Sequence, residues 1–137
     1  MSKLYVWVNS KLSSLQKGLQ SAHVVHELVA EYLLDPDAGQ PEREELTNWV
    51  RRGKIVVVLE GGSHGELSEM VDFFGEMPED DDYPFGYFIE DDLNEAITAV
   101  GIVLDAEWDR ENRDELANLN EWETVLLAKL TRSREAA

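Results

Sequence analysis

Apolar positions follow two periods along this chain, and the shorter period predicts strands. Residues 3–9 alternate apolar with polar side chains, residues 54–60 form the most hydrophobic run, and residues 87–90 and 98–105 are further short apolar segments. Such segments, rich in β-branched and aromatic residues, are typical of strands. We therefore expect four strands. The run 54–60 ends at a Gly-Gly pair, and its continuous hydrophobicity predicts a central, buried strand.

The longer period predicts helices over residues 15–34, 41–52, 64–75 and 115–132. In the first helix, one apolar row at near-helical spacing predicts the buried face: Leu15, Leu19, Ala22, Val25, Val29 and Leu33. The last helix has a similar row, made of Leu116, Leu119, Trp122, Leu126, Leu127 and Leu130. This row needs a partner surface, which is either the sheet of the same chain or a second copy of the protein.

The order of these elements predicts an α/β fold, with a four-stranded mixed sheet, helices on both faces and an added C-terminal helix. The length of 137 residues fits one domain. We expect residues 1–105 to form the α/β body, and residues 106–137 to add an acidic connection and the last helix to the same domain. Trp108, in that acidic connection, is a candidate for contact with a partner.

The charge is strongly negative, with 29 acidic and 12 basic residues, a net charge of -17 and a pI near 4.3. Nucleic-acid phosphates repel such a chain unless its few cations gather on one face. Cysteine is absent, which excludes disulfides and thiolate zinc sites within this sequence and fits a cytoplasmic protein. No apolar segment approaches the length of a membrane span, so we expect no membrane contact.

The most distinctive polar pattern is the HVVHE segment, which holds His23, His26 and Glu27. Two histidines three residues apart on a helix can share a metal ion. The segment matches neither HExxH nor HxxEH, however, and no third ligand is identifiable. We therefore interpret the histidines as hydrogen-bonding helix residues and expect neither a metal nor a cofactor.

The same stretch carries a family resemblance. Lys17-Gly18, Ser21-Ala22 and His26 follow one another at the start of the first helix, directly after a strand. This order resembles the signature of the type 2 peptidyl-tRNA hydrolases, with His23 standing where that family has a glutamine. Residues 49–60 and 87–91 resemble two later motifs of the family in the same order, so the resemblance covers roughly residues 3–105.

The resemblance implies a three-layer α/β fold and cleavage of the ester bond between a peptide and tRNA. It further implies that Lys17 and Gly18 hold a phosphate or the oxyanion, that His26 acts as base or orients the water, and that Asp91 orients the histidine or the water. On the substrate side it points to Ser21, His23, Glu95 and Thr98. Glu95 stands where the family has a threonine, and residues 97–99 replace a longer loop.

A second hypothesis keeps the fold without catalysis. The acidic surface would then engage a basic protein surface, whereas an enzyme would bind tRNA; a homodimer through the last helix is compatible with either. Five cations discriminate between the two hypotheses, because an enzyme needs them gathered around His26: Lys11, Lys17, Arg51, Arg52 and Lys54.

Overall fold

The computed structural model describes residues 2–91, 95–105, 108 and 119–136. Four strands form one sheet in the order β2-β1-β4-β3: β1 (Lys3–Asn9), β2 (Ile55–Gly62), β3 (Phe85–Glu90) and β4 (Ala96–Leu104). Strand β1 is parallel to β2, and β4 is antiparallel to both β1 and β3. The first three strands therefore all end at one end of the sheet, where β4 begins. We call it the C-terminal end of the sheet.

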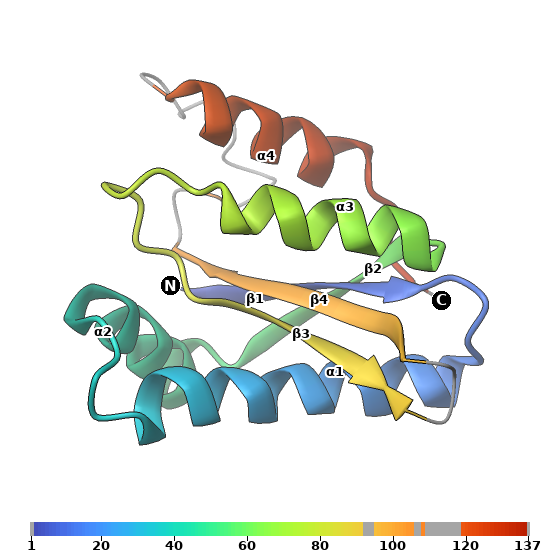
Figure 1. Ribbon diagram of the computed structural model, residues 1–137, viewed down its shortest axis with the longest axis horizontal. Coiled ribbons are helices and arrows are strands. Elements are labelled where there is room, and N and C mark those ends of the chain that lie inside the picture. Colours follow the sequence, from blue (N-terminus) through green and yellow to red (C-terminus); the bar gives the residue numbers. More distant parts are fainter. Residues whose placement is uncertain (1, 92–94, 106–107, 109–118, 137) are drawn as a thin grey trace.

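Helices cover both faces of this sheet (Figure 1). Helix α1 (Ser14–Leu28) continues as a wider π-helical segment, η1 (Val29–Leu34), and lies on one face with α2 (Gln40–Asn48) and its extension η2 (Trp49–Gly53). Helices α3 (His64–Gly75) and α4 (Glu121–Arg132) lie on the other face. The predicted α/β architecture with a four-stranded mixed sheet is thus confirmed.

Local sequence explains where three of these helices begin. Ser13, Ser63 and Asn120 each accept a hydrogen bond from the backbone three residues later, and the side chain at that later position bonds back to the cap. Such capping boxes satisfy backbone N–H groups that have no partner inside the helix.

The two faces of the sheet have separate hydrophobic cores. On the α1 side, Leu4, Val6 and Val8 of β1 pack with Val24 and Leu28. On the α3 side, the alternate residues of β1, Tyr5 and Trp7, pack in a cluster that includes Phe74 and Trp122. Strand β1 is therefore buried on both faces, as a central strand requires.

The predicted central position of the run 54–60 is wrong, because β2 lies at an edge of the sheet and β1 and β4 are central. Ile55 and Val56 remain 39% and 41% exposed at its beginning. Its end is covered by the C-terminal segment, where the Glu60 N–H donates to the Arg134 carbonyl (2.8 Å) and the Ala136 N–H donates to the Val58 carbonyl (2.8 Å). Hydrophobicity alone did not reveal that these distant residues shield this strand.

The predicted buried row of α1 is also wrong. Leu15 and Leu19 are 77% and 54% exposed, whereas the buried residues of the helix are Gln20, Ser21, Val24 and Leu28. The true face is rotated by about one residue, or 100°, around the helix axis. This face is buried because it allows the helix to approach the sheet closely: Val24 packs against Gly101 and Leu28 packs against Gly86, two strand residues without side chains.

The last helix packs back on its own chain. The Trp122 ring stacks on Phe73 at 4.9 Å, and its Nε1 donates to the Phe73 carbonyl at 2.8 Å. Trp108 is 2% exposed and donates to the Tyr83 hydroxyl (3.2 Å), so its predicted role in partner contact is wrong: it belongs to the core. Residues 115–118 of the predicted helix lie outside the described residues.

Candidate functional site

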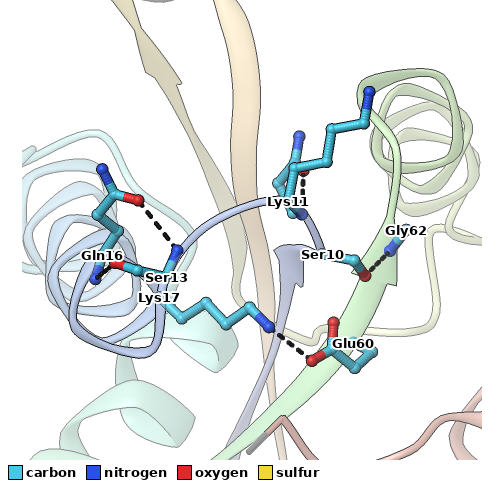
Figure 2. A network of polar contacts seen from close by, with 8 residues as sticks. Ser10, Lys11, Ser13, Gln16, Lys17, Glu60 and Gly62 are labelled. Atoms are coloured by element: carbon cyan, nitrogen blue, oxygen red, sulfur yellow. Dashed lines mark hydrogen bonds and ion pairs between the residues drawn. The ribbon is translucent and has the colours of Figure 1, made fainter.

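The loop between β1 and α1 is fixed to the end of β2 (Figure 2). The Ser10 N–H donates to the Gly62 carbonyl (2.9 Å), and the Gly62 N–H donates to the Ser10 hydroxyl (3.0 Å). Gly62 has a φ of 82°, a backbone conformation that favours glycine. The entrance of α1 is thereby held at the C-terminal end of the sheet, where polar groups of α/β proteins commonly gather.

Lys17 lies in the first turns of α1 and pairs with Glu60 of β2 (Figure 2). Its Nζ atom is 2.7 Å from the Glu60 Oε1 atom, and its side chain is only 12% exposed. The hydrogen bond from Lys17 lowers the pKa of Glu60, so that carboxylate remains charged at neutral pH. Glu60 therefore occupies the position next to the ammonium group that a bound anion would take.

A second polar cluster joins α1 to the end of β3 and the start of β4. The Thr98 hydroxyl donates to the Gln20 Oε1 atom (2.7 Å), and the Gln20 Nε2 atom donates to the Glu90 carboxylate (3.2 Å). The β3–β4 register shifts near Thr98, which turns both Thr98 and Ala99 toward α1. Gln20 was missed by the sequence analysis; its position one turn after Lys17 was the available signal.

The predicted site residues on α1 fall into two groups along the helix: Lys17, Gly18 and Ser21 near its start, and His23 and His26 further along. Gln20 lies beside Glu90, whereas further along the His23 ring stacks on Phe88 at 4.2 Å. His26 follows, exposed, with its ring 6.1 Å from that of His23.

The first group lies at the C-terminal end of the sheet, where Lys17 contacts Glu60 of β2. The Ser21 hydroxyl donates to the Lys17 carbonyl (2.8 Å), a bond within the helix. Asp91 and Glu95 are exposed beyond the ends of β3 and β4, and Glu95 has a φ of 59°. The structure thus joins Thr98, Gln20 and Glu90 at the strand end that precedes Asp91. Lys17 lies at the same end of the sheet but beside Glu60 of β2, the opposite edge strand, and His23 lies further along α1 against Phe88.

Gly18 has no packing role that explains a glycine inside a helix. A Cβ atom at this exposed position would meet no atom within 4 Å beyond its own helix and neighbours. We expect Gly18→Ala to raise the free energy of unfolding by about 0.5–1 kcal/mol, because glycine loses more backbone entropy in a helix than alanine does. Urea unfolding followed by circular dichroism measures this change.

The matched control is Gly101→Ala, where a Cβ atom would crowd Val24 and Leu4, so this variant should be destabilised. If Gly18→Ala lowers stability instead, the fold itself requires this glycine. If stability rises as expected, the glycine must be explained by something other than the fold.

A cleft of about 420 Å³ lies beside Glu60 on the α3–α4 side of the sheet. Its charged lining is mixed: Lys129, Arg132 and Arg134 with Glu60, Glu66 and Glu69. The three cations come from the end of α4 and the segment after it, to which the sequence analysis assigned no site residue. In the sequence, only the close spacing of the cations at residues 129, 132 and 134 indicated that they could lie together.

The five discriminating cations do not gather around His26. Lys17 lies at the C-terminal end of the sheet, where Lys11 follows the end of β1. Arg51, Arg52 and Lys54 belong to η2 and the residue before β2, and so lie at the opposite end of that strand. Eight residues of β2 separate the two sets, roughly 25 Å of extended chain.

Metal ligation is not supported in the part of the chain that the structure describes, because no three His, Asp or Glu side chains there form a group that could hold an ion. Of the helices described, none is long and apolar enough to cross a membrane. A comparison with known protein families gave no matching family model, and no curated protein is significantly similar to the chain.

Proposed function

We propose that the protein hydrolyses the ester bond between a peptide, or an N-blocked aminoacyl group, and tRNA, as the resemblance implies. The observation that carries the proposal is that the Thr98–Gln20–Glu90 cluster next to Asp91, and Lys17 with the exposed Gly18 beside it, lie at the same end of the sheet. Three further cations, Lys129, Arg132 and Arg134, line the cleft next to Glu60, together with the carboxylates of Glu60, Glu66 and Glu69.

The reaction needs an attacking water, a group that orients it and a stabiliser for the oxyanion. Water attacks the ester carbonyl carbon, the bond to the ribose oxygen breaks, and that oxygen receives a proton. In this proposal Asp91 orients the water, and Lys17, which faces Glu60 of β2 at the opposite edge strand, holds a phosphate of the tRNA. Substrate then has to displace Glu60 from Lys17.

His26 receives a different role from the one that the resemblance implies. It lies nine positions after Lys17, which is about 13 Å along the helix axis. Two side chains so far apart do not reach the same reacting atom. We therefore assign His26 to contact with the body of the substrate along the exposed face of α1.

The test is release of N-acetylated aminoacyl groups from tRNA, measured from low to high salt. We expect the wild-type protein to release them, Asp91→Asn to lower kcat by about 100-fold, and His26→Ala to raise KM more than it lowers kcat. Asp80→Asn, an acid in the exposed loop before β3, is the matched control and should leave release unchanged. A folded wild-type protein that releases nothing at any salt contradicts the proposal.

A second candidate function is non-catalytic binding of a basic protein. The net charge of -17 and the neutralisation of Lys17 by Glu60 favour it. Titration of the protein with deacylated tRNA separates the two candidates. Clear affinity for tRNA excludes a purely protein-binding role. A salt-sensitive association with a basic protein, without affinity for tRNA, supports the protein-binding role.

A further inference from the structure

Strand β3 forms the second edge of the sheet and has one free side. It pairs with β4, and no other strand among the described residues pairs with it. The Phe85 N–H donates to the Tyr32 hydroxyl (3.3 Å), which in turn donates to the Phe85 carbonyl (3.2 Å), so the backbone of Phe85 points away from β4. Backbone direction alternates along a strand, so Tyr87 and Ile89 present their N–H and C=O groups outward as well.

Within the described residues, neither a covering strand nor a lysine or proline of β3 protects this edge against strand addition. Natural edges are shielded by lysine, proline or a covering segment. The sequence of β3, FGYFIE, contains neither lysine nor proline, and Tyr87 and Ile89 are 40% and 39% exposed. The Tyr32 hydroxyl closes only the first outward position. A strand could therefore be added from Tyr87 onward.

A groove of about 490 Å³ runs along the free side of β3. Residues 85–89 form one wall, and the exposed carboxylates of Glu27 on α1 and Glu31 on η1 form the other. Partial burial raises the pKa of Glu31, and repulsion from Glu27 and Asp35 raises it further. A cation placed in this groove would relieve that repulsion, so the groove favours basic side chains.

We propose that β3 binds an extended segment of a partner protein whose residues alternate between basic and apolar, and that this segment adds to the sheet as a fifth strand. Successive side chains of an added strand point to opposite faces. Those on the α1 side would meet Glu27 and Glu31, and those on the other side would lie beside Tyr87 and Ile89.

The spacing of the two carboxylates fits this arrangement. Glu27 of α1 and Glu31 of η1 are about one helical turn apart, roughly 6 Å along the continuous helix, and residues i and i+2 of a strand are about 6.7 Å apart. One lysine or arginine can therefore face each carboxylate. A second copy of the protein is disfavoured, because antiparallel pairing of two β3 strands would place both acidic pairs on the same face of the joined sheet, in two chains that each carry a charge of -17.

The probe is a blocked nine-residue peptide that alternates valine and lysine. Its matched control has the same composition, with all lysines in one block, so the net charge is equal and the alternation is lost. We expect at least about tenfold tighter binding of the alternating peptide at physiological salt. By hydrogen exchange, the outward Tyr87 amide should exchange rapidly in the free protein and become protected on binding, while the Phe88 amide, already directed to β4, changes little.

Two variants locate the site. Glu27→Gln/Glu31→Gln should weaken binding of the alternating peptide about tenfold, and Glu79→Gln/Asp80→Asn, which removes the same charge from an exposed loop, should change it less than about twofold. Tyr87→Pro should still fold, because proline is tolerated on edge strands and no bond to β4 is removed. It should abolish binding, because the outward N–H group that would pair with the added strand is lost. If Tyr87→Pro fails to fold, the charge variants and the exchange measurement still decide.

Equal binding of both peptides, or no protection of the Tyr87 amide, overturns the proposal. A dimer in the wild-type protein that disappears with Tyr87→Pro overturns it as well, by showing that a second copy occupies the edge. The inference does not depend on hydrolysis. A protein that is inert on peptidyl-tRNA but binds the alternating peptide contradicts the proposed function alone, and the reverse result contradicts this inference alone.

Discussion

Leu28→Ala should lower the free energy of unfolding by about 2–5 kcal/mol, the range for truncating a fully buried leucine. Leu28 has no exposed surface and its side chain lies against Gly86 of β3, which has no side chain to fill the space that alanine would leave. Urea unfolding monitored by circular dichroism gives the change directly, and the slope of the transition should stay constant if only stability changes.

Leu19→Ala is the matched control, because it removes the same atoms from the same helix at a position that is 54% exposed. We expect a change of less than about 0.5 kcal/mol, since surface substitutions away from special features have small effects. Equal losses in the two variants would show that α1 packs through the row predicted from its sequence, and would contradict the orientation described above.

The orientation of α1 shows what hydrophobic spacing leaves undecided. Both Val24 and Val25 belong to acceptable helical rows, and the row with more apolar members ends at Leu15 and Leu19 in solvent. The deciding contacts are with Gly86 and Gly101, which lie more than 55 residues away in the chain. Spacing therefore predicted the helix correctly, while its rotation depended on tertiary packing.

The order of strands was likewise set by distant residues. Strand propensity located all four strands, and the capping residues Ser13 and Ser63 could be recognised from sequence. The apolar run of β2 resembles a central strand, but its outer side is occupied at its end by residues 134–136. In the central strand β4, the run of apolar residues is interrupted by Thr98 and Gly101, although both residues are buried.

The candidate site was predictable in part, through residues close in sequence. Lys17, Gly18 and Ser21 share one stretch of α1, so a resemblance in that stretch identified them. Glu60 and Gln20 escaped notice because their significance lies in partners far along the chain, Lys17 for the first and Thr98 for the second. The shift in register at Thr98 also has no signature in a single sequence, since strict alternation would place Thr98 and Ala99 on opposite faces.

Lys17→Met should lower release of N-acetylated aminoacyl groups from tRNA by about 10- to 100-fold, the loss expected when a charged hydrogen bond to a substrate phosphate is removed. Methionine keeps an unbranched side chain in the same packing position and removes only the charge. Lys11→Met, which removes an exposed lysine from the neighbouring loop, is the matched control and should change release less than about threefold.

Variants of Glu60, the partner of Lys17, separate a role of Lys17 in the reaction from a role in stability. Lys17→Met leaves the Glu60 carboxylate without its cation, so part of any lost release could come from lost stability. Adding Glu60→Gln to Lys17→Met removes that unpaired charge and should restore stability without restoring release. Glu60→Gln alone frees the ammonium group and should maintain or raise release, because Glu60 no longer competes with substrate. If release instead follows stability through all three variants, Lys17 holds the fold at the C-terminal end of the sheet and takes no part in the reaction.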